Sequence, residues 1–277
     1  IRASHGSKSI TIGNLTHAYN QAARGNGFLD EYVIDDATRA LILKYGDLCD
    51  DLHTDLHECL GHGSGQLLPG VSADALGAYG STIEEARADL FGLYYIADAK
   101  LVELGLVPDA DAYRSQYYTY LMNGLMTQLT RIKPGHEIEE AHMRNRALVA
   151  RWTLANYPSA LSLTQRDGKT YLQVNDYELL RQAFATLLAE IQRIKSEGDF
   201  DGVRSMVEQY AIHVDSVLHE EMLERYAKLG IAPYKGFLNP HMTLEQSADG
   251  TITDVRLDYS ETYEHQMLRY SSEYGYL

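Results

Sequence analysis

The sequence predicts a mainly helical protein that carries two small β-hairpins. Apolar residues recur every three or four positions over most of the chain, which is the spacing of one helix face. Proline and glycine separate these periodic segments where helices are expected to end. Two short stretches instead alternate between apolar and polar residues around an Asp-Gly pair, which is the pattern of a hairpin.

The first clear helix begins near Asp36 and leads to a short stretch that contains two histidines and several carboxylates. Its apolar positions form one stripe: Leu41, Tyr45, Leu48, Leu52, Leu56 and Leu60. Further helices are expected over residues 83–105, 110–131, 137–156, 177–196 and 201–229. Their limits follow from Pro108, Pro134, Pro158 and Gly230.

The two hairpins are expected later in the chain. Residues 161–174 alternate around Asp167-Gly168, and residues 242–258 alternate around Asp249-Gly250. Asp-Gly suits the tight two-residue turns that join antiparallel strands, because both positions need a positive φ. The hairpins interrupt a pattern that is otherwise helical.

Composition is that of a folded domain with an acidic surface. The 277 residues are 45% hydrophobic, which is enough to bury a large core, and we expect one domain. A net charge of −15 argues against a nucleic-acid partner, which would require a basic stripe. The longest apolar stretch, residues 90–107, contains Asp98, Lys100 and Glu103, so we expect no membrane span.

One segment, His57-Glu58-Cys59-Leu60-Gly61-His62, is similar to the H-E-x-x-H signature of zinc hydrolases, in which the Glu is the general base. Here, however, the histidines are five positions apart. A regular helix would direct them about 140° apart, whereas a π-type wide turn absorbs one residue and restores their alignment. We expect the backbone to yield at Gly61 and the helix to end within residues 62–65.

Other histidines of the chain serve as internal controls. His136 and His219 are each followed by Glu, but neither has a second His four or five positions later. His53 precedes His57 by four positions, yet Thr54 stands where the base would be. Only His57 has both the Glu and the partner, which favours a catalytic metal there over two ordinary polar residues at a helix end.

A catalytic zinc site needs a third protein ligand and leaves the fourth position to water. Glu84, Glu85 and Asp89 compete for this place. Thr82-Ile83-Glu84-Glu85 is also a capping box, so Glu85 has a purely structural interpretation as well. The metal interpretation makes Glu85 the ligand, while Glu84 and Asp89 accept hydrogen bonds from the free ring nitrogens of the two histidines.

These two segments resemble the signatures of the dipeptidyl peptidase III family, H-E-x-x-G-H and E-E-x-[RK]-A-[DE]. The resemblance implies that His57, His62 and Glu85 bind one Zn²⁺ and that Glu58 is the base. Residues 141–146 are similar to the family segment whose His contacts substrate and steadies the transition state. That role would fall to His142, with a further substrate contact from Arg146.

The resemblance also implies a larger enzyme. Members of the family are two-lobed and much longer, so we expect residues 1–277 to form a single zinc-binding catalytic lobe whose partner lobe is missing. A first residue other than Met agrees with a fragment. The short spacing between the two signatures is typical of bacterial members, and a cytoplasmic location is implied.

The expected reaction is hydrolysis of short peptides after the second residue, by a zinc-activated water whose proton Glu58 accepts. The isolated lobe should bind zinc but show feeble activity. A non-catalytic zinc-stabilised domain that binds a protein partner is the alternative, and it predicts four protein ligands. A metallohydrolase that does not cut peptides is a third possibility.

Overall fold

The structure, a computed structural model, describes residues 25–231 and 239–275. These residues fall into two compact units, one spanning Gly27–Gly230 and the other containing residues 239–275. The expectation that residues 1–277 form a single lobe of a larger enzyme stays a prediction.

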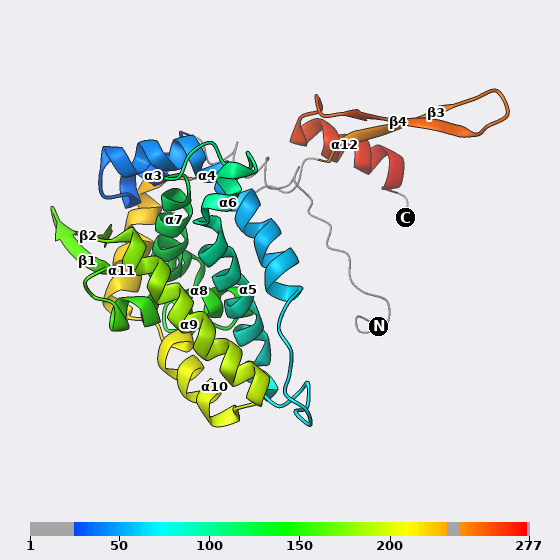
Figure 1. Cartoon of the computed structure of the whole chain (residues 1–277). Helices are drawn as coiled ribbons and strands as arrows, with labels where there is room; N and C mark the ends of the chain where they lie inside the picture. The colour runs from blue at the N-terminus through cyan, green and yellow to red at the C-terminus, as the bar shows by residue number, and fades with distance from the viewer. Residues whose placement is uncertain (1–24, 232–238, 276–277) are drawn as a thin grey trace. The chain divides into compact units, whose positions relative to one another are not determined.

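The first unit is built mainly from helices, as predicted (Figure 1). Its α-helices are α3 (Phe28–Tyr32), α4 (Asp36–Leu56), α5 (Gly80–Ile96), α6 (Ala99–Glu103), α7 (Tyr113–Leu125), α8 (Ala141–Asn156), α9 (Tyr177–Glu197), α10 (Phe200–Val207) and α11 (Ser216–Leu229). Shorter turns lie between them: the π-helical η1 (His57–His62) and η4 (Glu208–Ile212), and the 3-10 turns η2 (Gly77–Tyr79) and η3 (Thr127–Arg131).

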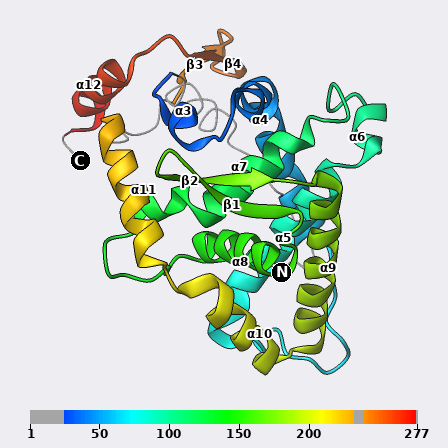
Figure 2. The ribbon, with the colours of Figure 1, turned by 90° about the vertical axis from the view of Figure 1, so that its left-hand side faces the viewer.

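Both hairpins are present where the alternation predicts them. Strands β1 (Leu161–Arg166) and β2 (Lys169–Val174) pair antiparallel, and the turn residues Asp167 and Gly168 both have positive φ, at 53° and 73°. This hairpin lies against α7 and α8 (Figure 2). In the second unit, β3 (His241–Gln246) pairs with β4 (Ile252–Asp258), and α12 (Tyr263–Tyr274) follows.

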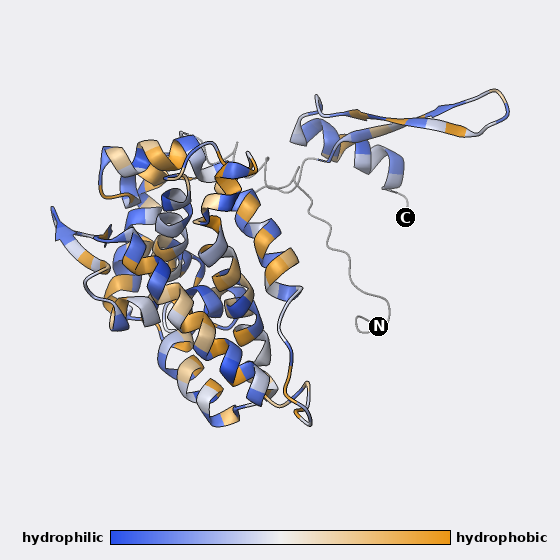
Figure 3. Ribbon diagram, viewed as in Figure 1, coloured by the Kyte–Doolittle hydropathy of each residue, from blue (hydrophilic) through white to orange (hydrophobic). Residues whose placement is uncertain are grey.

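The core of the first unit lies among α5, α7, α8 and α9. Fully buried side chains from each helix meet there: Leu90, Tyr117, Leu121, Leu148 and Phe184. The rings of Tyr117 and Phe184 pack edge to face, with 4.9 Å between their centres. Apolar and polar residues alternate along the helices in Figure 3, as one buried face per helix requires. None of the described helices combines the length and apolar character that a membrane crossing needs.

Several helix limits differ from the expectation. The predicted helix over 83–105 is two helices, because the side chain of Asp98 accepts a hydrogen bond from the backbone N–H of Lys100 and starts α6. Helix α5 begins at Gly80, so Thr82 is a buried interior residue and its interpretation as a cap is wrong. Asp215 likewise starts α11 inside the helix expected over 201–229.

The buried stripe of α4 also differs from the predicted one. Leu48 and Leu60 are 40% and 39% exposed. The residues that α4 buries are Ile42, Tyr45, Cys49 and His53. A histidine therefore occupies a place in the buried stripe where leucine was expected, and this face leads directly into the π-turn.

Candidate metal centre

Helix α4 continues into the π-turn η1, whose limits are the two histidines of the first signature. The wide turn brings Nε2 of His57 to 3.0 Å from Nε2 of His62. Regular helical geometry would direct the two rings apart. The predicted wide turn is therefore confirmed, and it brings the two imidazoles together as expected. The turn ends at His62 and is capped by Gly63, within the range expected from the sequence.

Gly61 is required by a close approach between helices. A Cβ on Gly61 would lie 2.6 Å from Cα and 2.7 Å from Cβ of Ala88, which belongs to α5. Any side chain would therefore push the π-turn off this helix. The small residues at the two positions let the first signature rest directly on the second.

Helix α5 supplies the third candidate ligand. Oε2 of Glu85 lies 3.4 Å from Nε2 of His57 and 3.6 Å from Nε2 of His62. These three residues form one of two groups in the described part of the chain whose donor atoms could hold a metal ion. The sequence-based candidates for the ligand set thus lie together.

The geometry of this group fits a zinc ion. Tetrahedral zinc with bonds of about 2.1 Å places its ligand atoms about 3.4 Å apart, close to the three separations observed. Oε2 of Glu85 is buried and has no hydrogen-bond partner within the described residues. Since Nδ1 of each ring faces a carboxylate, both Nε2 atoms would present lone pairs to the same point once the rings are neutral. A divalent cation would satisfy all three atoms.

Asp89 fixes the orientation of His57. Its Oδ1 lies 2.6 Å from Nδ1 of His57 and 3.2 Å from Nε2 of His53, and its Oδ2 accepts a hydrogen bond of 2.8 Å from the hydroxyl of Tyr120. Burial alone would raise the pKa of Asp89, but the hydrogen bonds from His53 and His57 hold it well below its usual range. The carboxylate is therefore charged and able to fix the ring.

His57, His53 and Asp89 make up the second group of donor atoms close enough to hold a metal. The ring nitrogens of this group already face Asp89 at hydrogen-bond distance, so hydrogen bonding accounts for it. Burial of His57 acts to lower its pKa, but the neighbouring carboxylates of Asp89 and Glu85 together have the larger effect and raise the pKa of His57 to about 10. Metal binding at this ring would displace a proton.

Glu84 holds the other histidine. Its Oε1 lies 2.8 Å from Nδ1 of His62, and the carboxylate also contacts Arg87 and Lys195. Burial acts to raise the pKa of Glu84, but hydrogen bonds from Arg87, Lys195 and His62 lower it to about 2. Each histidine thus has its own ionised carboxylate behind it, as the sequence predicts for Glu84 and Asp89.

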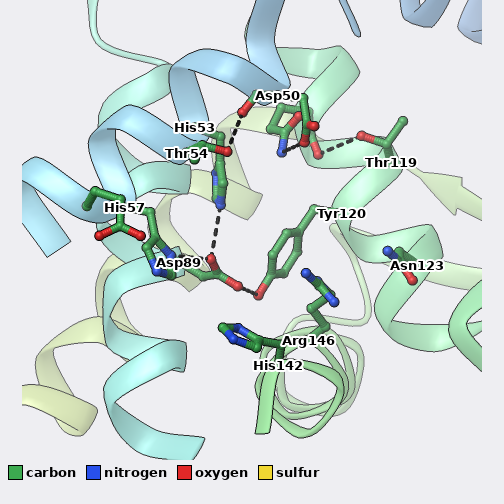
Figure 4. Close-up of a pocket in the computed structure, with 12 residues that line it drawn as sticks. Asp50, His53, Thr54, His57, Asp89, Thr119, Tyr120, Asn123, His142 and Arg146 are labelled. Carbon is green, nitrogen blue, oxygen red and sulfur yellow. Dashed lines mark hydrogen bonds and ion pairs between the residues drawn. The ribbon is translucent and has the colours of Figure 1, made fainter. Parts of the chain in front are cut away.

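A pocket of about 440 Å³ lies beside these residues (Figure 4). Glu58, His142 and Arg146 line it together with His57, Asp89 and Tyr120. His142 and Arg146 both come from the start of α8, and Nδ1 of His142 is 3.4 Å from Oε2 of Glu85. The side chain of His142 is 53% exposed, so it is accessible to a molecule entering the pocket.

Sequence reasoning missed several residues that hold the site, among them His53, Tyr120 and Arg87. His53 is set aside on sequence grounds because Thr54 follows it, although its position one turn before His57 places it on the same face. Arg87 lies within the second signature, but nothing in the spacing reveals which atoms it contacts. Tyr120 comes from α7, and no local pattern marks it.

The fold and the site together define a helical protein with a candidate metal centre at the contact of two helices. A sequence model of Peptidase family M49 matches residues 1–76 and 70–264, and the chain belongs to this family. Human dipeptidyl peptidase 3 is 26% identical over 261 residues, covering 78% of this chain and 34% of the human protein. The mouse protein of the same name gives the same identity and coverage.

Two solved structures have the same fold. Dipeptidyl peptidase III from Caldithrix abyssi aligns with a TM-score of 0.63 at 24% identity, covering 83% of this chain and 41% of that one. The enzyme from Corallococcus sp. strain EGB aligns with a TM-score of 0.62 at 22% identity, covering 80% and 38%. The present chain spans about a third of the length of the curated relatives it matches.

Proposed function

We propose that the full-length protein is a zinc-dependent dipeptidyl peptidase that releases N-terminal dipeptides from short peptides. The observation that carries this proposal is the convergence of Nε2 of His57, Nε2 of His62 and Oε2 of Glu85. Membership of Peptidase family M49 supports peptide hydrolysis, and the names of the curated relatives support dipeptide release.

Each residue of the site has a task in this proposal. His57, His62 and Glu85 would hold the ion. Bound zinc supplies Lewis-acid chemistry, since it lowers the pKa of a coordinated water toward about 7 and polarises a carbonyl group. Asp89 and Glu84 keep the two imidazoles in the tautomer that offers Nε2.

Glu58 is the proposed general base. Its half-buried carboxylate lines the pocket next to His57. It would accept a proton from the attacking water and transfer it to the amine that leaves. Its position in the π-turn, between the two candidate ligands His57 and His62, supports this role.

His142 and Arg146 are the proposed substrate contacts. The imidazole of His142 would donate a hydrogen bond to the carbonyl oxygen of the cut bond as that oxygen gains negative charge, which contributes roughly 3 kcal/mol. Arg146 lines the same pocket one turn further along α8, so its guanidinium is available for a peptide carbonyl or carboxylate.

A non-catalytic zinc domain would require a closed site. Among the described residues, the group of His57, His62 and Glu85 offers three candidate ligands, and His57 also lines a pocket. Three protein ligands and one accessible position are the arrangement of catalytic zinc. We further propose that the remainder of the full-length chain supplies a second lobe and completes the peptide-binding cleft.

A panel of dipeptidyl arylamides, assayed with the full-length protein, tests the proposal. Release of the arylamine with zinc bound is expected. Glu58→Ala should retain zinc but lose nearly all turnover, whereas Glu103→Ala, an exposed carboxylate on α6, should leave both unchanged. Release of single amino acids, or undiminished turnover in Glu58→Ala, would contradict the proposal.

A further inference from the structure

We propose that Arg87 is a positioning residue that fixes the π-turn and Glu84 in one arrangement and thereby directs His62 at the metal position. This inference rests on the proposed function. It adds a task for a residue to which neither the signatures nor the spacing assigns one.

The Arg87 guanidinium connects the two signatures. Its side chain is fully buried. Its Nη2 donates to the carbonyl oxygen of Gly61 at 2.7 Å and to Oε1 of Glu84 at 2.9 Å, while Nε donates to Oε2 of Glu84 at 3.1 Å. Its Nη1 contacts the Ser64 hydroxyl at 3.2 Å. One side chain thus holds the end of the π-turn and the carboxylate that faces His62.

The contact at Gly61 stabilises the unusual turn. A π-turn departs from the regular ladder of helical hydrogen bonds, and its last carbonyl groups need other donors. The carbonyl oxygen of Gly61 accepts from the backbone N–H and the hydroxyl of Ser64, at 3.2 and 3.1 Å, as well as from Arg87. Ala88, the next residue, has a small side chain that lets Gly61 approach α5 closely. Adjacent residues of α5 therefore hold the turn, one by hydrogen bonds and the other by its small size.

The contact at Glu84 sets the direction of His62. Oε1 of Glu84 faces Nδ1 of His62 and accepts from Nη2 of Arg87, so the guanidinium fixes the oxygen that the imidazole contacts. Lys195 reaches the opposite oxygen, but its ammonium is a single flexible point of charge. Without Arg87, Glu84 would keep a cation yet lose the two-point contact that stops its carboxylate from rotating.

The second signature allows arginine or lysine at this position, and the contacts made here are ones that only arginine can make. Its planar fork presents donors in fixed directions to a carboxylate on one side and a carbonyl on the other. Lysine would keep the charge but could not make the two-point contact. Methionine would fill much of the volume and supply no donor. The two substitutions therefore separate charge from geometry.

The test uses full-length protein carrying Arg87→Lys or Arg87→Met. Zinc dissociation constants come from chelator competition, and the visible absorption of the Co²⁺ form reports ligand geometry. Both variants should bind zinc about 10–100-fold more weakly, the usual effect of losing a residue that orients a ligand, with an altered Co²⁺ spectrum. Arg87→Lys should not restore the wild-type spectrum.

Arg181→Met is the matched control. Arg181 also packs on α5 and donates to a backbone carbonyl, that of Tyr94, but it pairs with Asp98 away from the site. Its loss should lower stability and leave zinc affinity and the Co²⁺ spectrum unchanged. Should Arg87→Met fail to fold, Arg87→Lys alone decides the matter.

Wild-type zinc affinity and an unchanged Co²⁺ spectrum in a folded Arg87 variant would overturn the inference and leave the proposed function intact. If wild-type protein bound no zinc, or if His57→Ala did not weaken binding, the proposed function would itself be wrong.

Discussion

Asp89 lies 2.6 Å from Nδ1 of His57, and this contact directs Nε2 of the same ring toward His62 and Glu85. Asp89 is buried, and the hydroxyl of Tyr120 holds its other oxygen. The candidate metal centre therefore depends on hydrogen bonds that extend from α5 to α7 behind the ligands.

Replacing Asp89 by Asn should weaken zinc binding by about 10–100-fold, because the charge that favours the correct His57 tautomer is lost. Asp55→Asn, an exposed change on α4, should have no effect. Chelator competition measures both constants. Equal affinities for the two variants would mean that Asp89 does not orient the ligand.

The hydroxyl of Tyr120 should contribute measurably to stability. Tyr120→Phe leaves a buried carboxylate oxygen without a donor, so the free energy of unfolding should fall by about 1–3 kcal/mol. Tyr117→Phe, on the same helix, removes a buried hydroxyl that has no hydrogen-bond partner within the described residues, so it should not destabilise the protein. Urea unfolding compares the two, and the reverse order would contradict this prediction.

Glycine substitutions in α4 and in the π-turn should act in opposite directions. Gly61→Ala forces a Cβ to 2.6 Å from Cα of Ala88, so it should destabilise by about 1–3 kcal/mol and weaken metal binding. Gly46→Ala, inside α4, meets only Ile42 at 3.4 Å and should stabilise by about 0.5–1 kcal/mol. Urea unfolding of both variants measures the difference, and a neutral Gly61→Ala would show that the close approach is unnecessary.

Glu31 should contribute to a loss of stability in acid. Its burial acts to raise its pKa, but Lys169 and Arg225, at 2.8 and 2.7 Å, lower it below the ordinary value of 4.5. A depressed pKa in the folded state means that the stabilisation is present above pH 4.5 and is lost as the pH falls through the folded-state value. The free energy of unfolding, measured from pH 7 down to acid, should therefore decline less steeply in Glu31→Gln than in wild type.

Glu224→Gln on α11 is the control for this series, because Glu224 is 65% exposed and its distance to Lys228 is 4.0 Å. Its pH profile should follow that of the wild type. A Glu31→Gln profile as steep as the wild type's would show that other carboxylates cause the acid loss.

The sequence predicts the parts of this protein that local rules govern. The five-residue gap between His57 and His62 predicts the π-turn, and Asp-Gly pairs predict both hairpins. The predicted helix limits are wrong where a side chain forms a hydrogen bond with the backbone, as Asp98 does at the start of α6. The residues that support the site could not be predicted for another reason. Tyr120 and Lys195 contact the acidic residues of α5 from α7 and α9, and such contacts depend on packing between segments that are distant in the sequence.

We expect one zinc ion to bind where the two signatures meet. A zinc-loaded crystal, with the ion located by anomalous scattering, would show its ligands. We predict one zinc bonded at about 2.0–2.2 Å to Nε2 of His57, Nε2 of His62 and a carboxylate oxygen of Glu85, with its fourth position open to the pocket. Zinc held by His53 and Asp89, or rings turned so that Nε2 of His57 and His62 no longer converge, would contradict it.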